Sequence, residues 1–240
     1  YKNKIFILKK FTADLIEGNI STSGQINFDN SKKIFLKGSF KNIYFNRALN
    51  QLNIANWKRV NIKISSPKFN FNTINGSNKE IIENLNGKLD IKGSLFFVST
   101  EEEKFGATLL SLIADKFSEI LSVSKSVNYL LNRFADIPSD ISGNLKFTNG
   151  FISSENLLIQ NEKGKAKFLF KFDILENSIN GKILFFKEDN IFLEAELKGN
   201  LQSPEILISD DVLDPNNKKN IKNIFEDGIQ SLVDRILKID

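Results

Sequence analysis

Apolar and polar residues alternate with a period of two along most of this chain. In residues 165–174 (KAKFLFKFDI) every second side chain is apolar, and four of the other five are charged. This period is typical of a β-strand with one apolar face and one solvated face. The same alternation recurs at 20–28, 34–40, 60–64, 69–71, 87–99, 141–147, 179–185 and 191–201. The pattern therefore predicts a series of half-buried strands.

The apolar spacing becomes helical in two longer segments. Thr100 followed by three glutamates fits a helix capping box, and apolar residues then recur at helical spacing until Pro138. Asp214-Pro215 is a standard helix opening before the amphipathic C-terminal residues. Ser77, with a glutamate three positions on, predicts a helix of one or two turns over 77–85, and 46–57 is ambiguous.

These elements together predict an α+β fold that is mainly β. We expect a curved antiparallel sheet shaped as a groove, a long amphipathic helical segment in mid-chain and an amphipathic helix at the C-terminus. The expected regions are N-terminal strands over 1–99, a helical insertion over 100–137, antiparallel strands over 138–209, and a loop with the last helix over 210–240.

A short phrase, apolar-x-Gly-Ser/Asn-apolar, occurs four times in the predicted strands. It spans Leu36–Phe40, Ile91–Leu95, Ile141–Leu145 and Leu197–Leu201. The glycine falls on the apolar side of the strand each time. Glycine there permits a bulge or a close backbone approach, so we expect the sheet to curve into a trough.

Composition removes several kinds of chemistry from consideration. The chain has no Cys and no His. Thiolate and imidazole nucleophiles, His- or Cys-based metal sites and disulfides are therefore excluded. The net charge is +4, with the lysines scattered over outward strand positions, so we predict no nucleic-acid binding. The chain starts at Tyr1, contains no Met and has no apolar run near 18–20 residues; we expect a segment of a longer protein.

Clustered carboxylates have simpler explanations than catalysis. Helix capping accounts for the triplet that begins at Glu101, and Asp210-Asp211 lacks the further ligands of a metal site. Glu194 and Glu196 share the outward face of one strand and are interpreted as solvated rather than as a glycan-hydrolysing pair. We therefore predict no catalytic residue, no metal and no cofactor.

The main candidate site is the apolar side of the strands. A concave sheet of this kind would bury acyl chains at about 0.8 kcal/mol per methylene. The alternative is that the predicted helices cover this face as an ordinary core, leaving a structural or protein-interaction module. The residues predicted to line the groove are Leu145, Phe147, Phe168, Phe170, Phe172, Ile183, Phe185, Leu193 and Leu197.

One predicted strand, 87–95 (GKLDIKGSL), leads into the predicted long helix. A second strand, 143–152 (GNLKFTNGFI), then opens a run of strands that ends in 197–206 (LKGNLQSPEI). This order of elements resembles the C-terminal region of AsmA-like proteins. The resemblance covers most of residues 85–210, and it implies that the alternative interaction module would belong to the cell envelope as well.

This resemblance implies a non-enzymatic bacterial envelope protein. Such proteins are held in the inner membrane by an N-terminal anchor, which would lie outside this segment, and face the periplasm. The implied function is lipid transport in support of outer-membrane assembly, with phospholipid acyl chains as the ligand and envelope proteins as further partners.

Overall fold

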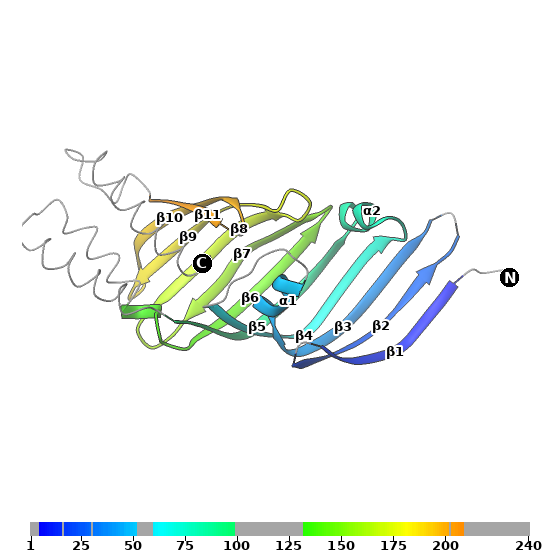
Figure 1. The fold of residues 1–240 in the computed structure, drawn as a ribbon, viewed down its shortest axis with the longest axis horizontal. Helices are drawn as coiled ribbons and strands as arrows, with labels where there is room; N and C mark the ends of the chain where they lie inside the picture. Colours follow the sequence, from blue (N-terminus) through cyan, green and yellow to red (C-terminus); the bar gives the residue numbers. More distant parts are fainter. Residues whose placement is uncertain are drawn as a thin grey trace, which may run out of the picture.

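The computed structural model describes residues 5–15, 17–29, 31–51, 60–98, 132–201 and 203–208. Its dominant element is one antiparallel sheet of eleven strands, each paired with its neighbours in sequence (Figure 1). The strands are β1 (Ile5–Leu15), β2 (Gly18–Asn27), β3 (Lys33–Tyr44), β4 (Val60–Ile74), β5 (Asn86–Phe97), β6 (Ser139–Thr148), β7 (Phe151–Gln160), β8 (Lys165–Asp173), β9 (Ser178–Lys187), β10 (Asn190–Asn200) and β11 (Ser203–Ile208).

The strands are stacked along the long axis of the molecule, from β1 at one end to β10 and β11 at the other (Figure 1). Neighbouring strands in a sheet lie about 4.8 Å apart, so eleven of them span roughly 50 Å. The regions 1–99 and 138–209 belong to the same sheet, because β5 pairs with β6 from Asn86↔Thr148 to Leu95↔Ser139.

The strand register separates two faces. Residues directly opposite each other on antiparallel neighbours point to the same side of the sheet. We call the side that carries Phe69, Leu89 and Ile141 the inner face, and the opposite side the outer face. One inner-face row crosses six strands through Leu8, Gly24, Leu36, Phe71, Gly87 and Phe147.

All four glycines of the repeated phrase lie on the inner face, as predicted. Gly38 is opposite Phe69, Gly93 opposite Ile64, Gly143 opposite Ile91 and Gly199 opposite Ile179. A Cβ atom at Gly38 would overlap with the carbonyl oxygen of Ser21 on the neighbouring strand and lie 2.8 Å from Cζ of Phe69. The backbone therefore approaches closely at this position, which only glycine permits.

A short helix, α1 (Phe45–Gln51), follows β3 and packs on the inner face (Figure 1). Leu49 is buried, and Phe45 packs against the core of the sheet. The Oδ1 of Asn46 accepts a hydrogen bond from the backbone N–H of Ile62 at 3.2 Å, which fixes the helix against β4.

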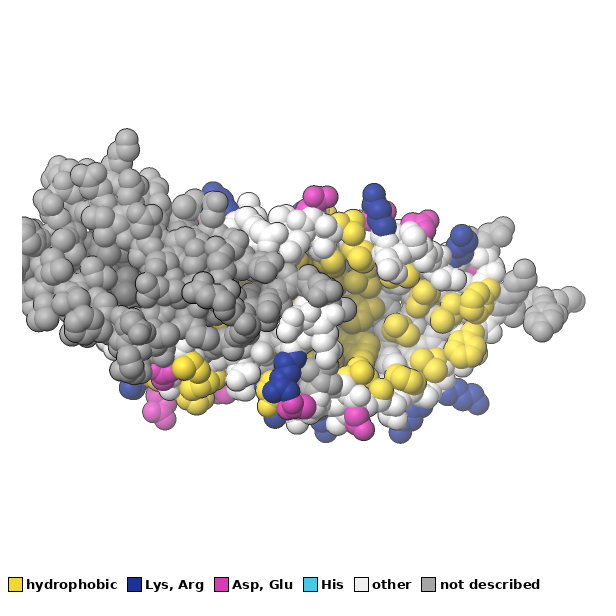
Figure 2. Space-filling model, viewed as in Figure 1, with side chains coloured by type: hydrophobic (Ala, Val, Ile, Leu, Met, Phe, Trp, Pro, Cys, Tyr) yellow, Lys and Arg dark blue, Asp and Glu magenta, His cyan; other side chains and the backbone are white. Residues whose placement is uncertain are grey.

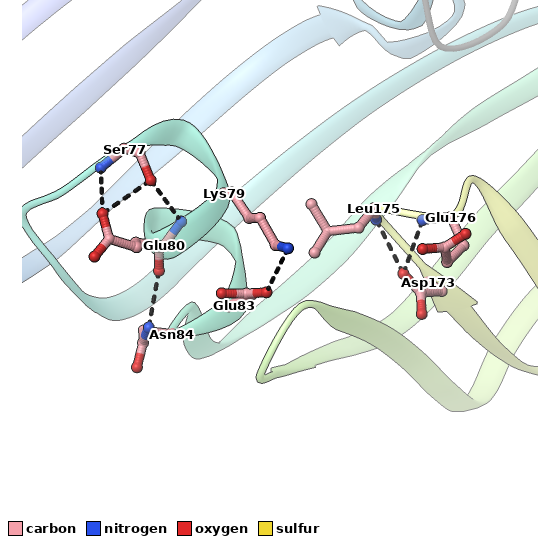
Figure 3. Close-up of polar contacts among 8 residues, drawn as sticks. All are labelled: Ser77, Lys79, Glu80, Glu83, Asn84, Asp173, Leu175 and Glu176. Atoms are coloured by element: carbon pink, nitrogen blue, oxygen red, sulfur yellow. Dashed lines mark hydrogen bonds and ion pairs between the residues drawn. The ribbon is translucent and has the colours of Figure 1, made fainter.

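A second short helix, α2 (Asn78–Glu83), has the predicted capping box (Figure 3). The hydroxyl of Ser77 accepts from the backbone N–H of Glu80, and the Glu80 carboxylate accepts from the backbone N–H and the hydroxyl of Ser77. These hydrogen bonds to Ser77 lower the pKa of Glu80 below its usual value. The box satisfies N–H groups that the first helical turn leaves free.

Acidification should weaken the N-terminal cap of α2. A carboxyl group whose pKa is lowered by folding stabilises the fold above its unfolded pKa, and loses that contribution as the pH falls through the folded pKa. We therefore expect the protection factor of the Glu80 amide, which compares its exchange rate with that of an unstructured peptide at the same pH, to fall on acidification across that range. Ser77→Ala should raise the pKa of Glu80 and speed the exchange already at neutral pH. An unchanged Glu80 titration in the Ser77 variant, followed by NMR, would contradict the capping assignment.

Two-residue and Asp-centred turns connect the strands. Asn149 and Gly150 both have positive φ, at 49° and 85°, which suits the tight β6–β7 hairpin. In the β8–β9 turn, the carboxylate of Asp173 accepts from the backbone N–H groups of Leu175 and Glu176 (Figure 3). Short turns of this kind keep successive strands adjacent.

The predicted α+β class is wrong. The structure is mostly β: strands make up 72% of it, in one large sheet with only short helices, whereas the antiparallel pairing agrees with the prediction. The prediction fails because it treats two amphipathic segments as elements that define the fold class. Those segments, 100–137 and 210–240, lie outside the described residues except for 132–137. Within the described ranges, no helix has the length and apolar character needed to cross a membrane.

Candidate functional site

The inner face of β1–β10 carries no charged residue among the side chains that the structure describes. Its positions are Ile, Leu, Phe, Val, Ala and Gly, with Ser or Thr at a few sites such as Ser66, Ser139 and Ser154, and Asn190 at the start of β10. The charged side chains described on these strands lie on the outer face. This segregation creates a continuous apolar surface along the sheet.

Phenylalanine rings line the middle of this surface. Phe40, Phe69 and Phe71 lie in series, with centroids 6.3 Å and then 5.4 Å apart. Phe71 then meets Phe147 edge to face at 4.9 Å, although these rings come from β4 and β6. They can meet because Gly87, which lies between them on β5, has no side chain. The rings therefore form a continuous aromatic band from β3 to β6.

Burial of the inner face changes along the sheet. At β8–β10 several of its side chains are shielded from solvent: Leu193 is fully buried, and Ala166 and Ala195 nearly so. At β1 it is open, since Phe6 is 51% exposed and Phe11 is 49% exposed. The space-filling view shows apolar side chains gathered in a hollow on this face (Figure 2). The accessible part of the apolar surface is thus at the N-terminal end.

All nine residues predicted to line a groove lie on the inner face. Four are partly buried, namely Leu145, Phe147, Phe168 and Phe170. The other five, Phe172, Ile183, Phe185, Leu193 and Leu197, are buried. Whether any of them contacts lipid stays a prediction.

The sequence interpretation missed the accessible residues on β1. Phe6, Leu8 and Phe11 face inward, but a bulge at Lys9-Lys10 interrupts their alternation. A bulge inserts one extra residue and shifts the period by one. Phe6-x-Leu8 and Phe11-x-Ala13 can be interpreted as two segments of one strand whose alternation is offset by one residue, and this interpretation finds this part of the surface.

The outer face has a shallow depression over β1–β4. It has a volume of about 620 Å³ and adjoins a second depression of about 370 Å³, with which it shares Lys9, Ser23 and Lys37. It lies on the opposite side of the sheet from the predicted groove residues. Two outer-face rows form its walls: Ile7, Gln25, Phe35 and Asn72, and then Lys9, Ser23, Lys37 and Asn70.

The register gathers lysines that are scattered in the sequence. In β1–β5 the outer face carries two carboxylates, Asp14 and Asp90. Against these stand nine lysines: Lys9, Lys10, Lys33, Lys37, Lys41, Lys63, Lys68, Lys88 and Lys92. We call this surface the basic face. The interpretation of these lysines as dispersed is therefore wrong in three dimensions.

Lysines and carboxylates are balanced on the outer face of the C-terminal strands. Lys182 pairs with Glu194 at 2.5 Å, and Lys198 pairs with Glu196 at 2.6 Å. The hydrogen bond from Lys182 to Glu194 raises the pKa of the lysine, and the charge of Glu194 adds to the effect. Both glutamates are thus members of surface ion pairs, in agreement with their interpretation as surface residues.

Ligand sets for a metal ion are absent from the part of the chain that the structure describes, where no three Asp or Glu side chains converge. The feature that distinguishes this molecule is therefore its pair of contrasting faces. One is apolar and open at β1, and the other is basic over β1–β5.

Comparison with known proteins leaves the family of this chain open. No family model and no solved structure match it. The InaD-like protein of Rattus norvegicus is 33% identical over 85 residues, which cover 32% of this chain. The chain spans 4% of the length of that protein. So short a match carries no argument about fold or function, and the AsmA-like assignment stays a prediction.

Proposed function

We propose that the inner face is a non-enzymatic binding groove for the acyl chains of phospholipids. The observation that supports this is the continuous apolar inner face, which carries no charge among its described side chains and opens to solvent at β1. Soluble monomers rarely expose a contiguous apolar surface unless it binds something. Each methylene buried there would contribute about 0.8 kcal/mol. The AsmA-like resemblance points to the same ligand and to a periplasmic site at the inner membrane.

The shape of the surface favours a flexible chain over a compact ligand. The apolar row is only a few residues wide along each strand but runs through many strands, in the direction of the long axis. The aromatic band from Phe40 to Phe147 offers ring faces and edges without a hydrogen-bonding group. A linear hydrocarbon needs no polar partner and can follow such a surface, whereas a sugar or peptide would lose hydrogen bonds to water.

The test is binding of a phosphatidylcholine that carries a fluorescent acyl chain, at concentrations below its own aggregation. The variant combines Phe11→Gln with Leu15→Gln, two exposed inner-face residues of β1. We expect at least about tenfold weaker binding, since the loss of 1.4 kcal/mol of apolar contact is tenfold in affinity. Native mass spectrometry of the purified protein should in addition show co-purified phospholipid.

The matched control combines Leu175→Gln with Ile191→Gln. These apolar residues are 41% and 56% exposed, but they lie at the C-terminal strands, away from β1. The control should bind as the parent does. Equal affinity in both double variants, or a purified protein that carries a stoichiometric protein partner and no lipid, would refute the lipid groove and favour the interaction-module alternative.

A further inference from the structure

We propose that the basic face is a docking surface for a membrane that contains anionic lipids. This inference concerns the side of the sheet opposite the lipid groove and does not depend on the groove. It rests on three observations: an excess of unpaired lysines on β1–β5, large apolar side chains exposed among them, and the position of this surface behind the open end of the inner face.

The charge asymmetry is local. On the outer face of β1–β5 nine lysines stand against two carboxylates. On β6–β10 the described side chains are almost balanced, with six lysines and five carboxylates. The lysines are Lys146, Lys165, Lys167, Lys171, Lys182 and Lys198, and the carboxylates are Asp140, Glu155, Asp173, Glu194 and Glu196. Only the N-terminal half of the sheet thus presents a positive surface.

Among the described residues, no carboxylate forms an ion pair with the lysines around the depressions. Neither depression has a carboxylate in its lining. Lys9, Lys10, Lys37 and Lys68 are exposed and belong to none of the ion pairs among the described residues. On the C-terminal strands, by contrast, Lys182 and Lys198 each have a glutamate partner. Unpaired ammonium groups at one surface create a field that attracts an external anionic surface.

Exposed apolar side chains lie among these lysines. Ile7 is 64% exposed and Phe35 is 44% exposed, and both line the larger depression. Ile5, at 42% exposed, lies on the same side two residues from Ile7. The combination of lysines with exposed aliphatic and aromatic residues is the composition of interfacial membrane-binding surfaces, where apolar groups enter the headgroup region and cations contact anionic lipids. A nucleic acid would explain the lysines but not Ile5 and Ile7.

The two faces meet on the same strands. Phe11 opens onto the inner face, and the preceding Lys9 and Lys10 face outward on the same strand. The basic face therefore lies directly behind the accessible end of the apolar surface. Docking through Lys9, Lys37 and Phe35 would hold that end at the lipid surface.

The experiment is flotation of the full chain with vesicles of phosphatidylcholine, with and without phosphatidylglycerol. We expect binding only to the anionic vesicles, and loss of most of it between about 0.1 M and 1 M salt, as the Debye length falls from about 10 Å to 3 Å. Lys9→Gln combined with Lys37→Gln should weaken binding at least tenfold, because each lysine near an anionic surface contributes about 1 kcal/mol. Ile7→Gln combined with Phe35→Gln should weaken it as well.

The matched control is Lys182→Gln combined with Lys198→Gln, which changes the net charge by the same amount on the other half of the sheet. It should bind anionic vesicles like the parent. Equal losses in the two lysine variants would mean that total charge, not the basic face, governs binding, and would overturn the proposal. So would binding to an oligonucleotide that falls with the lysine variant, if vesicle binding is unaffected by Ile7→Gln/Phe35→Gln.

The lipid groove and the docking surface can be refuted independently of each other. The Lys9/Lys37 variant should lose its binding to anionic vesicles. It should keep its affinity for the fluorescent phosphatidylcholine, because this lipid is zwitterionic. The Phe11/Leu15 variant should lose its affinity for the fluorescent phosphatidylcholine but still float with anionic vesicles. If the parent protein does not float with vesicles that contain phosphatidylglycerol, the docking surface is refuted. The groove is then judged by its own test.

Discussion

Replacing Phe69 by alanine should lower the free energy of unfolding by about 3–5 kcal/mol. Phe69 is 5% exposed and lies at the centre of the aromatic band, with its ring between those of Phe40 and Phe71. Its Cζ also occupies the space left by Gly38 on the neighbouring strand. Truncation would leave a cavity that two rings and a glycine cannot fill. The measurement is urea denaturation, followed by circular dichroism.

Phe35→Ala is the matched control for this prediction. Phe35 lies on β3, the strand next to Phe69, but on the outer face, with 44% of its surface exposed. Surface substitutions usually change stability by less than about 0.5 kcal/mol, and we expect the control to stay below about 1 kcal/mol. If both substitutions lower the free energy of unfolding by the same amount, packing on the inner face does not dominate the stability of the fold.

Much of the sheet is predictable from the sequence because its connections are short. Period-two segments such as 165–174 became strands, and each of them pairs with its neighbour in sequence. A meander needs no information about distant segments beyond the turns, and Asn149-Gly150 is a turn that the chain itself encodes. The capping box at Ser77 is local in the same way.

The errors occur where the strands contain bulges. The alternation predicts two strands at 60–64 and 69–71, on either side of Pro67, but these segments form the single strand β4. A register shift between Ser65 and Phe69 accommodates the proline, which has no N–H to donate to the ladder. The Lys9-Lys10 bulge hid β1 in the same manner. Bulges break a period without ending a strand, so periodicity alone divides or omits such strands.

The basic face could not be predicted because it depends on register. Lys37, Lys88 and Lys146 are far apart in the sequence, yet pairing through Asn70 places them in one outer-face row. A register shift of one residue would move each of them to the apolar side. The charge pattern of a sheet is therefore a tertiary property, even when every strand is recognised correctly.

Replacing Gly87 by valine should destabilise the protein by about 1–3 kcal/mol, the usual cost of overpacking a well-packed core. A Cβ atom at this position would overlap with the carbonyl oxygen of Asn70 and with Cδ1 of Phe71. The matched control is Lys88→Val, the next residue along β5, which is exposed on the outer face. We expect no loss there, because valine favours strands. Urea denaturation of both variants provides the comparison.

A double-mutant cycle separates the two overlaps at Gly87. Phe71→Ala removes the ring atom that a valine would meet, but it leaves the carbonyl oxygen of Asn70 in place. The combined variant Gly87→Val/Phe71→Ala should therefore be more stable than the sum of the single losses predicts, with an interaction energy in the range of about 0.5–3 kcal/mol that contacting residues show. It should still fall short of Phe71→Ala alone. Strict additivity would mean that Gly87 is required by the close approach of the β4 backbone and not by the contact between Phe71 and Phe147. The aromatic band would then owe its continuity to the curvature of the sheet.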